Sequence, residues 1–265
     1  MQARITNCIR RSISSAAPTG VLSTTYRGTF FEERSMKILQ DHLSMSLRHV
    51  GGKSDGGIDL MGWWWLPPPS SGPGDAPIDP SLSRRRLRVL AQCKAEKRKA
   101  SPKYVREMEG VLHRYISLLN PSPALGAAST SQYPLVALLV SESPFTKATI
   151  LRAQSSPVPF FLLHIPPLPD PNAAATANEE SDSDEEPNEN KIGSAVWNPA
   201  LVRGLLDGKM EVRWERSPNG TGRPGLWWGG RRLQSWTPDN ASEADLTLDR
   251  EDSFFEALAE GEPSG

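Results

Sequence analysis

The amino-acid sequence predicts an α/β protein in which a mixed central β-sheet is flanked by helices. Three short apolar segments, at residues 86–94, 135–140 and 158–165, have the length and composition of buried strands. Segments with apolar residues at helical spacing precede and separate them. Strands that alternate with helices are typical of a sheet covered on both faces.

The first helix is predicted from Arg27 to Leu47, where apolar residues recur near helical spacing. These residues are Phe31, Ile38, Leu39, Leu43 and Leu47. Glu32 lies beside the apolar face of this helix and is a candidate site carboxylate, with neighbouring Glu33 as the alternative. A glycine-rich turn follows the helix.

Two strands are predicted after this turn. Asp59 ends the turn, and the apolar residues from Ile58 to Trp65 predict a strand in which three tryptophans alternate between the faces. We expect some of these tryptophans in the core and others against loops. The next strand, from Arg86 to Lys94, has a short apolar centre flanked by charged residues.

The second half of the core alternates helix and strand. A helix is predicted from Ser101 to Leu119, because Ser101 can serve as its N-cap and Pro102 fits its first turn. A strand at 135–140, a short helix at 144–153 and a strand at 158–165 follow.

Proline-, glycine- and acid-rich segments set the expected domain boundaries. Residues 67–80 and 120–132 predict loops, and the acidic run within 166–190 cannot bury a core. The sequence therefore predicts a presequence at 1–25, a core at 26–165 and a disordered acidic insertion at 166–192. A C-terminal extension of the core at 193–237 and an acidic tail at 238–265 complete the chain.

The N-terminal residues have the composition of a mitochondrial transit peptide. They are rich in arginine and serine, and the first acidic residue of the chain is Glu32. A mitochondrial location, in the matrix, is therefore expected, with a disordered basic terminus as the alternative. No segment is long and apolar enough to predict a membrane span.

Three polar residues lie where two of the predicted strands end or begin. Alternation places Gln92 and Lys94 on one face of their strand and Cys93 on the other. If the two strands pair, the Asp59 carboxylate converges with both. Mg²⁺ (or Mn²⁺) prefers oxygen ligands and is commonly held by one or two carboxylates. Asp59 is therefore the expected principal ligand and Gln92 a weaker one, while Lys94 would offset charge that develops on a phosphate.

This spacing alone has low specificity, because a turn aspartate and a solvated strand-end lysine give the same pattern. A basic cluster around the same strand favours a polyanionic partner, with DNA preferred over RNA, although a solvated charged face is the alternative. The candidates for nucleic-acid binding are Arg86, Arg88, Lys97, Arg98, Lys99 and Lys103.

Four segments, GTFFEERSMKIL, VGGKSDGGIDL, VLAQCKA and SPKYVREMEG, occur in this order along the chain. Together they resemble the motifs of Mrr-type restriction endonuclease-like domains. More closely, they resemble the fungal mitochondrial "required for respiratory growth protein 7" family, over roughly residues 26 to 165. The resemblance implies a PD-(D/E)xK nuclease-like core. It implies site residues at Glu32, at Asp55, Gly56, Gly57 and Asp59 around the turn, and at Gln92 and Lys94 on the strand.

The sequence therefore predicts a Mg²⁺-dependent nuclease that acts on mitochondrial DNA or RNA. One alternative is a catalytically inactive nuclease-fold protein that binds nucleic acid or a protein partner. A third is a respiratory-complex assembly factor without nucleic-acid contact. Cys8 and Cys93 are the only cysteines, which excludes a disulfide framework or a cysteine-based zinc site.

Overall fold

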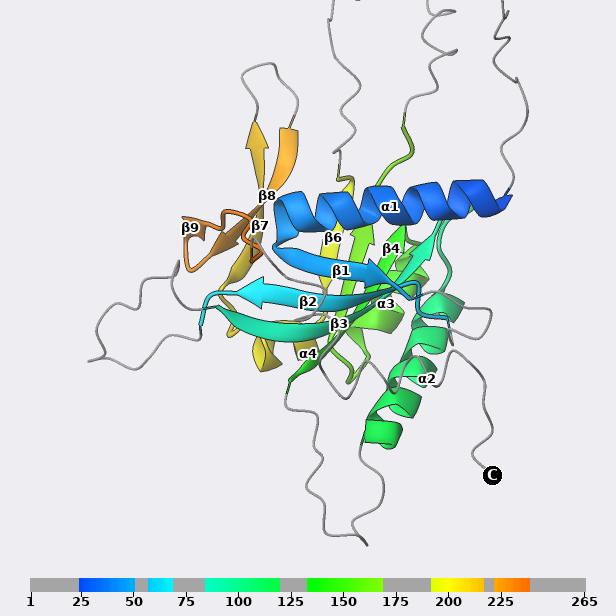
Figure 1. Cartoon of the computed structure of the whole chain (residues 1–265), viewed down its shortest axis with the longest axis horizontal. Helices are drawn as coiled ribbons and strands as arrows, with labels where there is room; N and C mark the ends of the chain where they lie inside the picture. The colour runs from blue at the N-terminus through cyan, green and yellow to red at the C-terminus, as the bar shows by residue number, and fades with distance from the viewer. Residues whose placement is uncertain are drawn as a thin grey trace, which may run out of the picture.

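A mixed sheet of six strands organises the molecule, and the strands lie in it in the order in which they follow one another in the chain (Figure 1). The computed structural model describes residues 24–50, 57–68, 84–119, 133–168, 192–216 and 222–238. The strands are β1 (Met45–His49), β2 (Leu60–Leu66), β3 (Arg85–Lys94), β4 (Leu135–Ser141), β5 (Phe160–His164) and β6 (Ser194–Trp197). The three strands β3, β4 and β5 are parallel, and β1, β2 and β6 are antiparallel to their neighbours.

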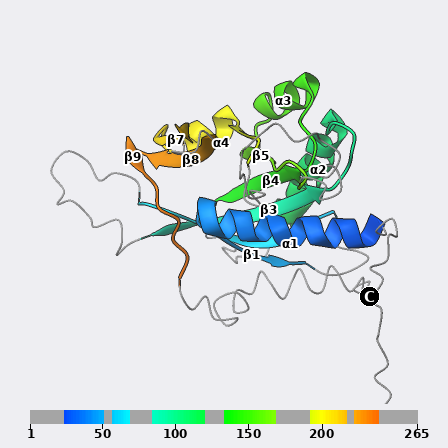
Figure 2. The ribbon, with the colours of Figure 1, turned by 90° about the horizontal axis from the view of Figure 1, so that it is seen from above.

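Helices cover both faces of this sheet. Viewed from above, α1 (Thr24–Leu43) lies along one face, whereas α2 (Pro102–Leu119) and α3 (Lys147–Gln154) lie on the other (Figure 2). The helices α2 and α3 connect the parallel strands, as parallel pairing requires. This arrangement confirms the predicted mixed α/β class.

A small second sheet and a short helix follow β6. The helix α4 (Pro199–Gly204) begins at Asn198, whose side-chain oxygen accepts a hydrogen bond from the Leu201 amide. The strands β7 (Met210–Arg216), β8 (Gly222–Trp228) and β9 (Arg231–Arg232) pair antiparallel in that order. Residues Leu201, Leu206, Met210 and Leu226 of this part of the chain belong to the core on the α1 face.

The first helix is shorter than predicted. It ends at Leu43, because Ser44 has a positive φ of 55° that a helix cannot continue. The C-terminal segment holds this turn, since the Ser44 amide donates to Ser235 Oγ and the Trp236 amide donates to Ser44 Oγ. The prediction of helix through Leu47 is therefore wrong, and Leu47 lies in β1.

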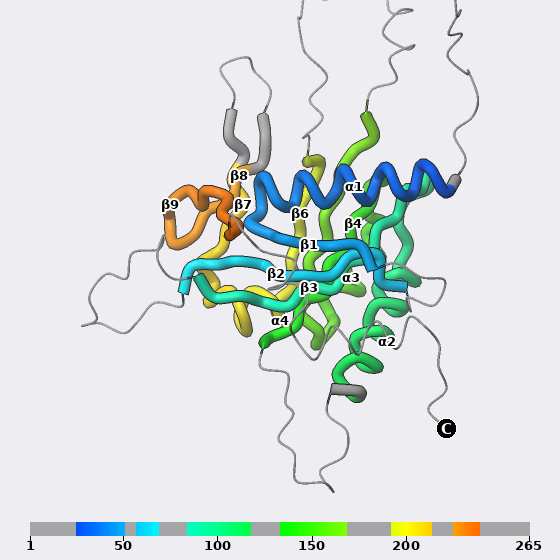
Figure 3. The backbone as a smooth tube through the Cα atoms, in the orientation of Figure 1, coloured from blue at the N-terminus to red at the C-terminus, as the bar shows by residue number. Residues whose placement is uncertain are grey.

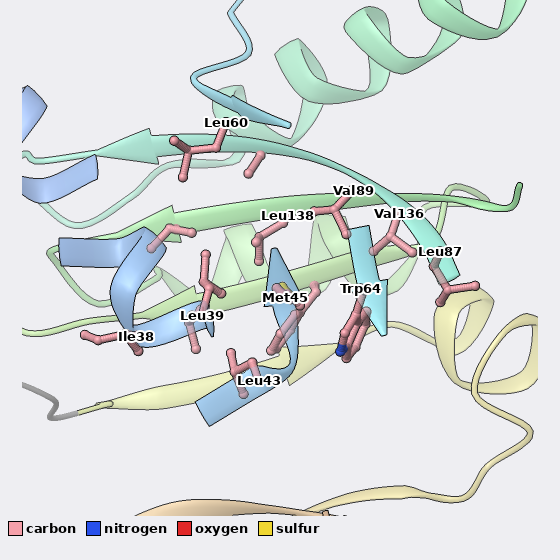
Figure 4. Packing of buried hydrophobic residues seen from close by; sticks show 14 of the residues in the cluster. Ile38, Leu39, Leu43, Met45, Leu60, Trp64, Leu87, Val89, Val136 and Leu138 are labelled. Carbon is pink, nitrogen blue, oxygen red and sulfur yellow. The ribbon is translucent and has the colours of Figure 1, made fainter. Parts of the chain in front are cut away.

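Two apolar layers make the core, one on each side of the sheet. On the α1 side, Ile38, Leu39 and Leu43 pack on the sheet, and Trp64 stacks on Phe161 with ring centroids 5.7 Å apart (Figure 4). On the other side, Val105, Met108 and Leu112 of α2 are among the residues that fill the core. The strands are apolar on both faces, as strands of a doubly covered sheet must be.

Gly62 lets β1 and β2 approach closely. A Cβ atom at this position would lie 2.1 Å from the Ser46 carbonyl oxygen and 2.8 Å from the Leu47 Cα, and both are backbone atoms. We expect Gly62→Ala to lower the free energy of unfolding by about 1–3 kcal/mol, as overpacking does. Urea unfolding measures the change. Gly110→Ala is the control, because its Cβ would meet nothing within 4 Å, and equal effects of the two substitutions would contradict the close approach.

Candidate active site

The ends of β2 and β3 place Asp59 beside the last residues of β3. Leu60 is paired with Ala91, and the Asp59 amide donates to the Ala91 carbonyl oxygen at 2.9 Å. The Asp59 carboxylate turns back along β3, where its Oδ2 accepts a hydrogen bond of 2.6 Å from the Cys93 amide. The carboxylate is therefore fixed in position by the strand that carries the other predicted site residues.

Gln92 precedes Cys93 on β3 and is buried, with 4% of its surface exposed. Its Oε1 atom is buried and has no hydrogen-bond partner among the described residues. Gly57 covers the other end of the amide. It has a φ of +88°, and a Cβ atom there would lie 3.3 Å from Gln92 Nε2. The predicted turn glycine is thus a neighbour of the site, whereas Asp55 and Gly56 lie outside the described residues.

Lys94 ends β3 two residues after Gln92, on the same face of the strand. Its side chain is half-buried, and Nζ lies 5.4 Å from the centroid of the Tyr104 ring. The Lys103 ammonium lies 5.0 Å from the same centroid. The Tyr104 ring therefore lies within cation–π distance of two ammonium groups, a role that the sequence did not indicate.

Glu32 lies on α1, beside the end of β1. Its carboxylate oxygen lies 3.3 Å from His49 Nδ1, while neighbouring Glu33 is exposed. The helix therefore turns Glu32, and not Glu33, toward the sheet. Figure 3 traces α1 across the strands, and an ion pair between Arg27 of its first turn and Glu142 after β4 fixes the helix there.

Three charged residues influence the buried thiol of Cys93. Burial raises the pKa of Cys93 well above its ordinary value, and the negative charges of Asp59 and then Glu32 raise it further. A hydrogen bond with Ser35 and the positive charge of Lys94 act in the opposite direction. Asp59, Glu32 and Lys94 thus all lie near enough to influence the Cys93 thiol. Cys93 packs in the α1 layer, whereas Gln92 and Lys94 lie on the other face of β3, the face on which Tyr104 packs.

The end of β3 offers the Asp59 carboxylate and the Gln92 amide oxygen as ligands. Among the described residues, no group of three or more histidine, cysteine, aspartate or glutamate side chains could hold a metal ion. A hard cation such as Mg²⁺ is often held by only one or two carboxylates and keeps several waters. The Asp59 carboxylate and the unsatisfied Gln92 oxygen, both at the end of β3, are ligands of the kind that such a cation takes.

The predicted basic cluster divides between the two ends of β3. Lys97, Arg98, Lys99 and Lys103 are exposed beyond the Lys94 end. At the opposite end, the Arg86 side chain donates to the Tyr133 hydroxyl.

Arg88 lies deeper, with 1% of its surface exposed, and its guanidinium is 4.6 Å from the Trp63 ring centroid. A side chain buried in this way does not present its charge to a polyanion. The sequence did not indicate this burial, because Arg88 lies among other charged residues at the start of the strand.

The environment of Tyr104 predicts an unusual titration. Burial, together with the hydrogen bond that its hydroxyl donates to Glu96, raises the pKa of Tyr104 to about 12 from an ordinary value of 10. The folded state therefore holds the phenol proton more tightly than the unfolded chain does. This difference contributes to the free energy of unfolding below pH 10, and the contribution is lost as the pH rises toward 12. Phenolate absorbance should show a late step that Tyr104→Phe removes and that Tyr26→Phe, at an exposed position, keeps. A Tyr104 step near pH 10 would contradict the buried contact.

Comparison with known proteins gives one curated relative. The chain is 31% identical over 129 residues to "Uncharacterized protein C824.03c, mitochondrial" of Schizosaccharomyces pombe. The alignment covers 48% of this chain and 46% of the relative, so the chain spans about half the length of the curated relative it matches. No solved structure matches the chain. No helix in the described part of the chain is long and apolar enough to cross a membrane.

A family model described as "Required for respiratory growth protein 7" matches residues 23–192. This span begins at the start of α1 and includes every residue of the candidate site. The family match and the mitochondrial relative confirm the predicted mitochondrial location. The chain belongs to the "required for respiratory growth protein 7" family.

Proposed function

We propose that this protein is a divalent-metal-dependent nuclease that hydrolyses phosphodiester bonds of DNA or RNA in mitochondria. The observation that carries the proposal is the buried Gln92 Oε1, which has no hydrogen-bond partner among the described residues; Gln92 directly precedes Cys93, whose amide fixes the Asp59 carboxylate. A buried acceptor without a partner costs about 1–3 kcal/mol, so such an atom calls for a ligand. A bound cation would supply one.

Asp59, Gln92 and Glu32 would hold Mg²⁺ or Mn²⁺ at this point. Such an ion polarises the phosphate and lowers the pKa of a bound water. Asp59 is positioned for the task because the Cys93 amide fixes one of its carboxylate oxygens. Glu32, which lies on α1, would add the second negative charge that a divalent cation prefers.

Lys94 would meet the phosphate of the substrate. Its ammonium stabilises negative charge that develops on the phosphoryl oxygens during attack. The Tyr104 ring, at 5.4 Å from Nζ, holds this cation on the face that Gln92 shares. Loss of Lys94 should therefore slow cleavage more than it weakens substrate binding.

The exposed basic residues after β3 would attract the substrate. Lys97, Arg98, Lys99 and Lys103 follow Lys94 within the loop and the first turn of α2. A positive surface beside a metal site raises the local concentration of a polyanion. DNA is the favoured substrate, and the assay below includes RNA so that the two are compared directly.

Cleavage by the purified protein tests this proposal. Labelled single- and double-stranded DNA and RNA are incubated with Mg²⁺, with Mn²⁺ or with a chelator. We expect metal-dependent cleavage that Lys94→Met reduces at least about 100-fold, the effect of removing one charge-stabilising group. Arg114→Met is the matched control, because Arg114 is exposed in the second half of α2. The absence of cleavage on all four substrates, or an undiminished rate in Lys94→Met, would refute the proposal.

A second candidate function is nucleic-acid or protein binding without catalysis. The observation that favours it is the neutral amide of Gln92, which is a weaker metal ligand than a carboxylate. In addition, no group of three or more histidine, cysteine, aspartate or glutamate side chains in the described part of the chain could hold a metal ion. This candidate expects binding that persists in chelator and that Asp59→Asn leaves unchanged. Metal-dependent cleavage in the same preparation would exclude it.

A further inference from the structure

A second cationic site lies at the opposite end of β3. A pocket of about 560 Å³ opens where β2 ends and β3 begins. Its lining residues are Trp65, Arg84, Arg85, Arg86, Leu87, Tyr133 and Pro134. Because β3 has ten residues, this pocket lies about 30 Å along the strand from Lys94. It therefore shares no residue with the candidate active site.

Arg84 has unused hydrogen-bonding capacity in this pocket. Its Nε and Nη1 atoms are buried and have no hydrogen-bond partner among the described residues. The Nε atom of Arg85 is also buried and also has no such partner. Burial also lowers the pKa of Arg84 and Arg85 from the ordinary arginine value. Both side chains are only partly covered, so an anion in the pocket would meet the part of each guanidinium group that is still exposed and offset the loss of hydration.

The neighbouring acids do not neutralise the three guanidinium groups. Arg85 donates to the Leu205 carbonyl oxygen and lies 3.8 Å from the Asp207 carboxylate. Arg86 is engaged with the neutral Tyr133 hydroxyl. The described contacts thus pair three positive charges with a single carboxylate, which leaves the pocket strongly cationic.

Aromatic rings stand beside these cations. Trp65 lines the pocket and packs edge-on against Trp236, with centroids 5.7 Å apart. The Arg84 guanidinium lies 5.6 Å from the Trp236 centroid, and the Arg86 guanidinium lies 4.4 Å from that of Tyr133. Guanidinium groups bind phosphate in a fork geometry, and aromatic rings stack on unpaired bases.

We propose that this pocket binds one nucleotide unit of a single-stranded nucleic acid, with its phosphate on Arg84 and Arg85 and its base against Trp65 and Tyr133. Its volume falls within the range of small-molecule sites, which run from about 300 to 1,000 Å³. A duplex keeps its bases stacked inside the helix and cannot offer one to such a pocket. Binding of a nucleotide at this pocket does not depend on catalysis at the Lys94 end of β3.

Binding of a fluorescent single-stranded oligonucleotide, followed by anisotropy in chelator, tests the pocket. We expect Arg84→Gln to weaken binding about tenfold, the effect of losing one hydrogen bond to a charged group. The slope of log affinity against log salt should fall by about 0.7, the value for one phosphate contact on a single strand. Arg84→Lys should weaken binding less, because it keeps the charge and loses the fork. Tyr133→Leu should weaken binding by about tenfold through lost stacking.

Arg114→Gln is the matched control, since it removes an exposed arginine on α2 and should leave affinity unchanged. Wild-type affinity in Arg84→Gln, with the fold verified by circular dichroism, would overturn the proposal. A mononucleotide or inorganic phosphate that binds as tightly as the oligonucleotide would also overturn it, because the ligand would then be a free nucleotide or a simple anion. These titrations measure binding and not cleavage. Failure at Arg84 therefore removes only the pocket, and absence of metal-dependent cleavage removes only the nuclease.

Discussion

Asp59→Asn is expected to reduce metal-dependent cleavage at least about 100-fold. The change removes the negative charge from the residue that we propose as the principal metal ligand. Partners that only orient a ligand already account for about 10- to 100-fold in metal affinity or activity, so the ligand itself should exceed this. Initial cleavage rates at several Mn²⁺ concentrations measure the effect. They also show whether excess metal restores activity, as weakened metal binding predicts.

The fold should tolerate this substitution. The asparagine keeps a side-chain oxygen that can accept the hydrogen bond from the Cys93 amide, whereas Asp59→Ala leaves that amide without its partner. Asp41→Asn is the matched control, because it neutralises an exposed aspartate on α1. Full activity in Asp59→Asn, or an equal loss in Asp41→Asn, would show that the Asp59 carboxylate is not the metal ligand.

Trp64→Ala is expected to lower the free energy of unfolding by about 3–5 kcal/mol. The indole is fully buried in the layer beneath α1 and stacks on Phe161, so truncation leaves a large apolar cavity. Because whole domains are stable by only about 5–15 kcal/mol, this loss brings the protein close to unfolding. Urea unfolding followed by circular dichroism gives the difference.

Phe30→Ala serves as the comparison for this prediction. Phe30 precedes the buried Phe31 on α1, but 45% of its surface is exposed. Its truncation should change stability by no more than about 0.5 kcal/mol. A similar loss in both variants would contradict the packing of α1 and β2 described above.

The strands and helices around the site were predictable because their signals are local. The apolar centre of β3 and the Ser101–Pro102 start of α2 each mark one element, and both elements were found at the predicted residues. The alternation of Gln92 and Lys94 follows from strand geometry once β3 is recognised. For this reason the sequence could place Gln92 and Lys94 on one face of the strand.

The features that sequence reasoning missed depend on distant contacts. The end of α1 at Ser44 is held by Ser235 and Trp236, which lie far away in the chain. The spacing of Leu43 and Leu47 also fits a helix, so β1 gave no separate signal. The choice of Glu32 over Glu33 depended on the helix register against the sheet.

The burial of Arg88 against Trp63 likewise depended on which face of β3 the helices α2 and α3 cover. Tyr104 became part of the site only because α2 begins beside the end of β3. The contact between its ring and Lys94 could not be predicted from the spacing of residues in the sequence. In each case, tertiary packing decided among local possibilities that the sequence left equal.

Respiratory growth most directly tests the central claim that catalysis at the end of β3 is what this protein contributes in mitochondria. Cells that lack the protein receive either the unchanged chain or Asp59→Asn, at equal mitochondrial levels, and grow on a non-fermentable carbon source. We expect the unchanged chain to restore growth and Asp59→Asn to fail, although it is folded and present. Full growth with Asp59→Asn would contradict the claim and would assign the protein's contribution to binding.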